Sequence, residues 1–332
     1  MGGTRFNGLH LVWELERYGH NVTILNRGMT EAYIPRNVRR LYADRKDHNA
    51  LREVLAGEKF DVIFDISAYV LDDVKGIVDI ISGRVGHYIF ASSTVVYGAT
   101  NILPITEDFP LDSTEQQSQY GIDKIICEEY LIDLQRKNRF PATIARFSMV
   151  FGPDNNLIDR EQRMFTRLLK GREILIPGRG TTLGQVGHVD DEARALRLMA
   201  MNPRTFGEIY NITGKDYFSD EGYVDTCAEA LGINAKKLFV PANVMDEIYL
   251  QYAPGYNGDR QLFIQKLAPY IHYWDRATIF SIDKLCSHLS FDPLYTFRTA
   301  VEQTYEWFVD KNIMAQRSYD FSREDELINR LS

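Results

Sequence analysis

Tyr120 and Lys124 have the spacing of an acid–base pair on one helix. They stand four residues apart in the run from Ser118 to Lys124, and residues four apart on a helix face the same way. A phenol titrates at about 10 in water, and a positive charge held close to it favours the phenolate. The spacing therefore predicts a tyrosine of lowered pKa that can exchange a proton with an alcohol. The same spacing also occurs on ordinary exposed helices, so the neighbouring motifs decide between the two interpretations.

Three hydroxyl-bearing residues precede this pair in the chain. Ser92, Ser93 and Thr94 end or follow an apolar run that starts at His87 and predicts a buried strand. Open α/β sheets bind their ligands at the carboxyl ends of the strands. We therefore expect these hydroxyl groups to lie near the same ligand as Tyr120.

The amino-terminal residues predict a phosphate-binding turn. Gly2, Gly3 and Gly8 precede an apolar helical run that extends to Tyr18, and a β-rich segment follows at Val22–Leu25. Glycines in such a turn let the backbone approach a pyrophosphate, which the free N–H groups at the start of the helix attract. A glycine-rich start is weak by itself, but its position before the other motifs makes the combination specific.

Strands and helices are predicted to alternate through the first half of the chain. The predicted strands are Val22–Leu25, Val38–Tyr42, Val62–Ile66, Tyr88–Ala91 and Thr143–Phe147. This alternation is typical of a doubly wound parallel sheet, the Rossmann-type α/β fold. We expect residues 1–153 to form a dinucleotide-binding domain, with returning segments near 185–213. Residues 154–332 are expected to form mainly a smaller, interleaved α+β substrate lobe.

The first strand of this fold is expected to be missing from the chain, because the glycine run already begins at Gly2. Without that strand the sheet has a gap between two neighbours, which leaves backbone groups unpaired. Either the start of the chain is misassigned, or a strand from elsewhere in the chain or from a partner subunit replaces the missing one.

Taken together, the motifs resemble the extended short-chain dehydrogenase/reductase superfamily, in particular its NAD-dependent epimerase/dehydratase branch of nucleotide-sugar enzymes. The resemblance extends to the segments Arg146–Pro153, Gly187–Asp191 and Ser281–Pro293. It implies that Ser93 hydrogen-bonds the reacting sugar oxygen and that Tyr120 takes or gives its proton. Lys124 would hold the nicotinamide ribose and lower the pKa of Tyr120, while hydride passes between the sugar and the nicotinamide.

The resemblance also implies a set of binding residues. The cofactor-binding set is Gly2, Thr4, Arg5, Phe6, Asn7, Gly8, Asn26, Arg27, Asp44, Arg45, Ser92, Tyr120, Lys124, Phe147 and Ser148. The candidate substrate-binding residues are Thr94, Met149 and Arg179. Arg179 ends a basic stretch that is either a solvated helix and loop or a partner for the diphosphate of a nucleotide sugar. The stretch comprises Arg160, Arg163, Arg167, Lys170, Arg172 and Arg179.

Two positions depart from the family pattern. Arg5 occupies the central glycine position of G-x-x-G-x-x-G, and this variant resembles a subgroup that includes chloroplast stem-loop RNA-binding proteins. A non-catalytic cofactor-sensing or RNA-binding protein on the same fold is therefore the alternative function. Met149 stands where related enzymes often carry an asparagine that contacts substrate.

The end of the second predicted strand bears on cofactor choice. An acidic residue there would accept hydrogen bonds from the ribose hydroxyls of NAD, but this chain has Asn26 and Arg27. With no carboxylate to repel a 2′-phosphate, and with Arg27 and Arg5 able to bind one, NADP is favoured over NAD. Arg27 also fits an ordinary solvated turn.

The reaction subtype stays open between epimerisation and one-way oxidation or reduction. Sugar 4,6-dehydratases follow the catalytic hydroxyl with Asp-Glu, whereas Thr94 and Val95 follow Ser93 here. No acid is therefore placed for water elimination, and dehydration is disfavoured. The resemblance favours an epimerase, while the cofactor argument favours a reductase.

Composition and charge are those of a cytoplasmic enzyme. The 332 residues carry a net charge of −8, which disfavours a nucleic-acid surface. Three scattered cysteines indicate a reducing compartment, and neither they nor the seven histidines have metal-ligand spacing. No long apolar run or leader indicates a membrane span or secretion. His188 is expected to be a structural hydrogen-bonding residue.

Two further expectations concern surfaces. In the family the helix that carries Tyr120 joins a four-helix dimer interface, and Ile125, Ile126, Tyr130 and Leu131 would permit a homodimer here. The tyrosine-rich segment 249–273 is expected to cover the cleft between the two lobes.

Overall fold

The structure is a computed structural model that describes residues 1–115, 117–252 and 276–331. The predicted cover over the cleft, residues 249–273, lies outside these ranges beyond Tyr252. Within the described ranges, no helix is both long and apolar enough to traverse a lipid bilayer.

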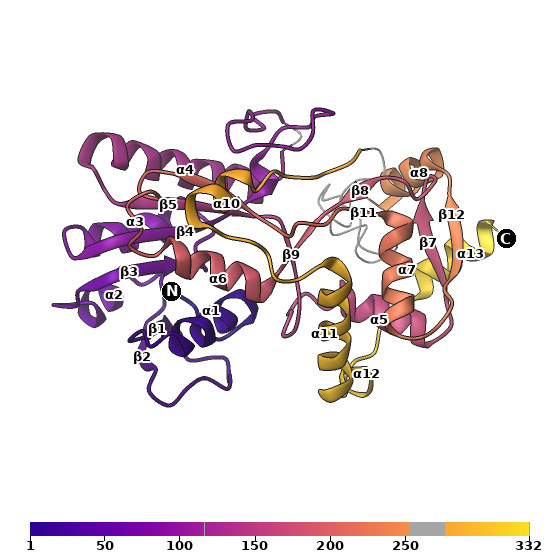
Figure 1. The fold of residues 1–332 in the computed structure, drawn as a ribbon, viewed down its shortest axis with the longest axis horizontal. Coiled ribbons are helices and arrows are strands. Elements are labelled where there is room, and N and C mark those ends of the chain that lie inside the picture. The colour runs from indigo at the N-terminus through magenta and orange to yellow at the C-terminus, as the bar shows by residue number, and fades with distance from the viewer. Residues whose placement is uncertain (116, 253–275, 332) are drawn as a thin grey trace.

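A parallel sheet occupies the centre of the amino-terminal half of the molecule (Figure 1). Its described strands, in spatial order, are β10 (Ile209–Ile212), β5 (Ala142–Phe147), β4 (Val85–Ser93) and β3 (Phe60–Asp65). A second parallel pair consists of β1 (Thr23–Asn26) and β2 (Arg39–Tyr42). All five predicted strands are present within a few residues of their expected bounds, so the Rossmann-type α/β expectation is confirmed.

The β1–β2 pair is not joined to β3 by strand pairing. Met1 and Gly2 lie between the two sets of strands. The Met1 amine donates a hydrogen bond to the Phe64 carbonyl (2.8 Å), and the Gly2 N–H donates one to the Leu25 carbonyl (3.0 Å). Backbone hydrogen bonds of these two residues therefore bridge the two sets where the sequence predicted a gap.

Helices cover both faces of the sheet, and the pattern of β4 shows why. Its side chains point alternately to opposite faces, as in any strand. Ile89 and Ala91 pack against one group of helices, whereas Tyr88 and Phe90 pack against the other. The first group is α1 (Phe6–Arg17), α6 (Val189–Met199) and α10 (Asp283–Leu289). The second group is α2 (His48–Val54), α3 (Leu71–Ile81) and α4 (Gln119–Asn138).

The carboxyl-terminal half contains a smaller lobe around a parallel pair of strands, at the end of the molecule that carries the C-terminus in Figure 1. The pair is β7 (Glu173–Pro177) and β12 (Lys236–Val240). The helices around it are α5 (Glu161–Leu169), α7 (Asp220–Ala230), α8 (Ala242–Tyr252), α11 (Phe297–Asp310), α12 (Ile313–Gln316) and α13 (Ser322–Leu331). The remaining described elements are short: η1 (Thr94–Val96), β6 (Met149–Phe151), β8 (Leu183–Gly184), β9 (Val186–His188) and β11 (Phe218–Ser219).

The chain returns to the sheet more often than the sequence indicated. Helix α6 and strand β10 fall in the expected returning region near 185–213. Helix α10 lies far beyond that region, yet Ile282, Leu285 and Leu289 belong to the core beneath the sheet. The two lobes are therefore interleaved up to residue 291.

A partly buried histidine ties α1 to the first turn of α6 and to the loop after β6. His10 Nδ1 lies 2.6 Å from Asp190 Oδ1, and His10 Nε2 lies 3.5 Å from Asp154 Oδ2. Burial opposes the charged imidazolium, but hydrogen bonds to the carboxylates of Asp154 and Asp190 outweigh it and raise the pKa of His10 to about 9. His188 is a structural residue, because its Nδ1 accepts from the Asp190 N–H and caps α6.

These contacts predict a pH-dependent contribution to stability. The folded pKa of His10 lies above its unfolded value, so the stabilisation is complete below about 6.5 and is lost as the pH rises through about 9. We expect His10→Gln to lower the free energy of unfolding by about 2 kcal/mol at pH 6, since half-exposed carboxylates are partly screened. Urea unfolding at pH 6, 7.5 and 9.5 measures this difference, with the exposed His20→Gln as control. A difference that did not shrink toward alkaline pH would contradict the assignment.

Candidate active site

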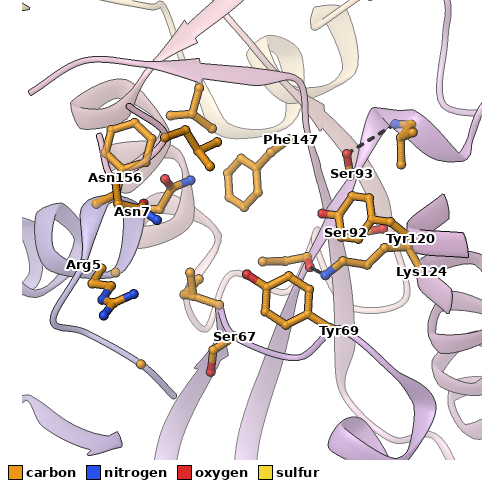
Figure 2. Close-up of a pocket in the computed structure, with 18 of the residues that line it drawn as sticks. Arg5, Asn7, Ser67, Tyr69, Ser92, Ser93, Tyr120, Lys124, Phe147 and Asn156 are labelled. Atoms are coloured by element: carbon orange, nitrogen blue, oxygen red, sulfur yellow. Dashed lines mark hydrogen bonds between the residues drawn. The ribbon is translucent and has the colours of Figure 1, made fainter. Parts of the chain in front are cut away.

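A pocket of about 800 Å³ opens at the carboxyl ends of β1, β3, β4 and β5. All predicted catalytic and cofactor-binding residues line it, and so do Thr94 and Met149. Figure 2 shows the glycine-turn residues Arg5 and Asn7 on one side, with Ser93, Tyr120 and Lys124 on the other. The topology therefore brings together residues from both ends of the amino-terminal half.

The glycine turn has the geometry of a phosphate cradle. Gly2 and Gly3 have φ values of +93° and +101°, a region that favours glycine. A Cβ on Gly3 would meet the Ile24 side chain at 2.7 Å. Helix α1 starts at Phe6 with no side-chain cap from Arg5, so its first N–H groups remain available beside the pocket. These residues fit the diphosphate of a dinucleotide.

Gly8 packs directly against the backbone of this cradle. A Cβ there would meet the Gly3 nitrogen at 2.8 Å, a backbone atom that cannot rotate away. We expect Gly8→Ala to displace the start of α1 and to weaken dinucleotide binding by roughly tenfold to a hundredfold, because small misplacements of positioned groups are costly. Calorimetric titration measures the loss. Gly222→Ala in α7 is the control, since its Cβ would meet only the Ser219 hydroxyl. Unchanged binding by Gly8→Ala would contradict the cradle.

The residues expected to bind the adenosine end of the cofactor make different contacts within the protein. Asn26 accepts a hydrogen bond from the Gly28 N–H (2.8 Å), so its amide oxygen shapes the turn. Arg27 is exposed, and its Nη1 lies 3.9 Å from Asp44 Oδ2. Arg5 donates from Nε to the Thr30 hydroxyl (3.2 Å) at the same end of the pocket.

The Arg45 side chain is held by hydrogen bonds and ion pairs within the protein. Its two Nη atoms donate to both carboxylate oxygens of Asp65 (3.0 and 2.8 Å), and Nη1 also donates to the Ser67 hydroxyl (2.9 Å). Its Nε lies 3.2 Å from Asp73 Oδ1. Arg45 therefore fixes the pocket wall between β3 and α3, and its charge is already balanced by two carboxylates.

The two serines at the end of β4 have separate roles. The buried Ser92 hydroxyl donates to Glu128, a carboxylate on α4. Ser93 faces the pocket, and its hydroxyl accepts from the Val95 N–H (3.3 Å), as the dashed line in Figure 2 shows. Ser93 is therefore the serine that can meet a ligand, whereas Ser92 attaches the strand to α4.

Helix α4 positions Tyr120 and Lys124. The Ser118 hydroxyl accepts from the Gly121 N–H (3.1 Å) and caps the helix, which places Tyr120 in the first turn and Lys124 one turn later. Lys124 is buried, and its Nζ donates to the carbonyls of Ala68 (2.7 Å) and Ala91 (2.6 Å). The two side chains face the same pocket, as the four-residue spacing predicted.

The protonation state of Tyr120 differs from the expectation. Its pKa is raised to about 12, mainly by burial and also by Tyr69, while interactions with Ser93 and Arg160 lower it in part. Because Tyr120 is 42% exposed to the pocket, solvent there screens part of this rise. The sequence predicted a lowered pKa from Lys124, and this prediction is wrong. The physical reason is that the Lys124 ammonium hydrogen-bonds two carbonyls instead of the phenol.

The residues after β5 are less open to a ligand than expected. The Ser148 hydroxyl donates to Thr213 Oγ1 (2.6 Å), and Met149 packs in the core of the smaller lobe. Phe147 is buried beneath the sheet, with one side on the pocket (Figure 2). Thr94 is also buried. These residues therefore form a largely apolar wall.

The basic stretch that was expected near a diphosphate lies mainly elsewhere. Arg163 and Arg167 both donate from Nη2 to Glu324 of α13 (2.8 Å each), so they fasten the carboxyl-terminal helix to α5. Arg179 is exposed in the turn after β7 and does not line the pocket. Its predicted substrate contact therefore stays a prediction, without support from the pocket lining. Of that stretch, Arg160 lines the pocket.

Several pocket residues were missed from the sequence. Tyr69, Asn156 and Arg276 line the pocket from the loop after β3, the loop before α5 and the start of the segment 276–331. No spacing or motif indicated them, since each comes from a loop that the tertiary fold brings to the sheet edge. Tyr69 lies close to Lys124 and Tyr120 in Figure 2.

Comparison with known proteins identifies relatives of two kinds. The chloroplast stem-loop binding protein of 41 kDa b from Arabidopsis thaliana is 32% identical over 246 residues, which cover 70% of this chain and 62% of that protein. The 2′-dehydrokanamycin reductase of Streptomyces kanamyceticus is 24% identical over 244 residues, covering 73% of this chain and 68% of the reductase. The chain thus spans less than two thirds of the length of the first of these relatives.

Solved structures show the same fold. The UDP-glucose 4-epimerase of Thermotoga maritima, solved with UDP-glucose, superposes with a TM-score of 0.75 at 19% identity, covering 94% of this chain and 98% of the epimerase. The sequence model of the NAD dependent epimerase/dehydratase family matches residues 1–213, which is more than half of the chain. On that match, the chain belongs to the NAD-dependent epimerase/dehydratase family.

Proposed function

We propose that this protein is an NAD(P)-dependent oxidoreductase or epimerase that acts on a hydroxyl group of a nucleotide-linked sugar. The observation that carries the proposal is the grouping of Ser93, Tyr120 and Lys124 in one pocket with the glycine turn at the start of α1. A proton-transfer group and a diphosphate cradle in one cavity are what hydride transfer at a sugar carbon requires.

Each residue of the group has a distinct task. Ser93 presents a hydroxyl that can hydrogen-bond the sugar oxygen, and Tyr120 exchanges the proton of that oxygen. A bound nicotinamide would supply the group that accepts or returns hydride. The raised pKa of Tyr120 keeps its phenol protonated at neutral pH, and a protonated phenol is the form that donates to a carbonyl. This supports a reductive step at the sugar.

Arginine side chains at the pocket support a phosphate-bearing substrate. Arg160 and Arg276 line the cavity, and Asn156 lies beside them in the lining. Guanidinium groups bind phosphate through charge-assisted hydrogen bonds, often two at once. A nucleotide diphosphate attached to the sugar would place its charge there.

For the cofactor we propose NADP in preference to NAD. Asn26, the last residue of β1, has no carboxylate, and the guanidinium groups of Arg5 and Arg27 line the same end of the pocket. A 2′-phosphate on the adenosine ribose would meet two cations there, whereas Asp44 is already within 3.9 Å of Arg27. For NAD, the Asn26 amide takes the place of the usual carboxylate at the end of this strand.

Calorimetric titration of the purified chain with NADPH, NADP, NADH and NAD tests the proposal. We expect micromolar or tighter binding, with the phosphorylated forms preferred. Turnover is then followed by the absorbance of the reduced cofactor with a panel of uridine and thymidine diphosphate sugars. A folded protein that bound none of the four dinucleotides would overturn the proposal.

The alternative is a non-catalytic RNA-binding protein on the same fold. The name of the Arabidopsis relative, a stem-loop binding protein, favours this alternative. The net charge of −8 opposes it, because RNA backbones require clustered cations. Gel-shift titration with a stem-loop RNA at about 50 and 200 mM salt decides between the two functions. Binding to the RNA that weakens steeply at the higher salt concentration would support the RNA-binding alternative, because contacts to phosphate depend on salt.

We further propose a homodimer formed through α4. Ile126 is 39% exposed on that helix, and Ile125 and Tyr130 are partly buried. Leu131 is fully buried in the core, so it is unavailable to an interface. Light scattering at micromolar concentration should give the mass of two chains, and Ile126→Glu should give that of one. A monodisperse wild-type monomer would overturn this proposal.

A further inference from the structure

Three aromatic rings surround the Lys124 ammonium. Its Nζ lies 4.7 Å from the ring centroid of Phe90, 5.4 Å from that of Tyr69 and 5.6 Å from that of Tyr120. All three distances are within the range of cation–π attraction. Tyr69 and Tyr120 also contact each other, with ring centroids 6.2 Å apart. The rings come from β4, the loop after β3 and α4, so they enclose the ammonium from three sides.

The hydrogen bonds of Lys124 leave one donor unassigned. An ammonium has three N–H groups, and those to the carbonyls of Ala68 and Ala91 account for two. Two backbone carbonyls and three ring faces hold the Nζ in one place, beside the pocket. The remaining N–H is available to a hydroxyl group of a bound ligand.

Lys124 is charged without a carboxylate in contact. Among the described residues, no ion pair joins its Nζ to an Asp or Glu. The titratable groups that act on it are Asp65 of β3, Cys127 and Glu128 of α4, and Arg45 beside the pocket. Burial lowers the pKa of Lys124 to about 8, although Asp65 opposes this effect. The ammonium therefore still predominates at neutral pH, and contacts that favour it raise the pH at which the proton is lost.

We propose that Tyr69, together with Phe90 and Tyr120, forms an aromatic cage that keeps the Lys124 ammonium charged and in position for the pocket ligand. Tyr69 is thereby a positioning residue, which acts through Lys124. The inference rests on the proposed function for its catalytic meaning, but the cage itself consists of contacts within the protein.

Tyr69 is the member of the cage that can be changed without disturbing the core. Its side chain is 58% exposed, whereas Phe90 is fully buried in the sheet. The Tyr69 backbone is held independently of its ring, because its N–H donates to Asp73 Oδ2 (2.8 Å) at the start of α3. Substitution of the side chain should therefore leave the loop in place.

The decisive experiment is an NMR pH titration of the lysine side-chain signals in the full chain, with the Lys124 signal assigned by Lys124→Met. Tyr69→Phe retains a ring face and should titrate like the wild type. Tyr69→Leu retains apolar cover without a ring face, and it should move the Lys124 midpoint to lower pH by roughly half to one pH unit. Tyr217→Leu, a similarly exposed tyrosine outside the pocket lining, should leave the midpoint unchanged.

The outcomes separate the cage from other roles of Tyr69. An unchanged midpoint in Tyr69→Leu would overturn the cage. A midpoint that rose would also overturn it, since Tyr69 would then act by excluding water from Lys124. The titration needs no turnover, so absence of dehydrogenase activity would count against the proposed function, while the Lys124 midpoint would still support or overturn the cage. In an active enzyme, Tyr69→Leu should shift the alkaline limb of the kcat profile in parallel with the Lys124 midpoint.

Discussion

Replacing Tyr120 by Phe should lower kcat by roughly 10²- to 10⁴-fold, the usual contribution of a positioned acid or base. The substitution removes one oxygen atom from a side chain that is open to the pocket, so the packing of its ring on Lys124 and Tyr69 is retained. Cofactor affinity should therefore stay close to that of the wild type. Steady-state turnover combined with calorimetric titration measures both quantities.

The pattern of losses distinguishes a chemical role from a structural one. Tyr217→Phe removes the same oxygen from a tyrosine outside the pocket and should change neither quantity. Ser93→Ala should lower kcat as well, because its hydroxyl faces the pocket, whereas Ser92 is committed to Glu128. Survival of full activity in Tyr120→Phe would show that another group transfers the proton. Loss of cofactor binding in that variant would instead indicate a collapsed pocket.

Replacing Glu128 by Ala should lower the free energy of unfolding by about 3–5 kcal/mol, the cost of breaking a buried ion pair. Glu128 is fully buried and accepts from Arg146 Nη2 (2.6 Å) and Nε (3.1 Å). Its loss would leave the Arg146 guanidinium buried with a carbonyl of Glu107 and the ring of Tyr97 as its remaining partners. The Ser92 hydroxyl would also lose its acceptor, beside the Ser93 that faces the pocket. Urea unfolding measures the effect.

The same helix offers a matched control. Asp133 pairs with Lys137 one turn apart on the surface of α4, at 2.7 Å. An exposed pair at this spacing is worth only about 0.3–0.5 kcal/mol, so Asp133→Ala should be nearly silent. The double variant Glu128→Leu with Arg146→Met removes both charges and should regain much of the lost stability. Equal losses in Glu128→Ala and Asp133→Ala would refute the role of the buried pair.

The strands and most of the pocket lining were predictable from the sequence. Alternating and continuous apolar runs are local patterns, so all five predicted strands lie within a few residues of the observed ones. The carboxyl ends of parallel strands meet at one edge, which is why Ser93, Phe147 and Gly2 line one pocket. The four-residue spacing of Tyr120 and Lys124 likewise follows from helix geometry alone.

Only the tertiary structure decided which partner each charged side chain binds. Arg45 and Arg163 looked alike in the sequence, as cations near expected ligand sites. In the fold, Arg45 binds Asp65, which lies 20 residues away, and Arg163 binds Glu324, which lies 161 residues away. Arg179 meets no part of the pocket. Such pairings depend on which distant segments the core brings together, and no local pattern encodes them.

The sequence by itself determined which residues could do chemistry in this protein, and the tertiary structure decided their electrostatic state. The spacing of Tyr120 and Lys124 predicted a lysine that lowers the pKa of a phenol. The fold instead places carbonyls of Ala68 and Ala91 within hydrogen-bond distance of Nζ, 56 and 33 residues from Lys124, and adds the ring of Tyr69. The free energy of a buried charge depends on every dipole and ring around it, and those surroundings exist only once the chain is folded.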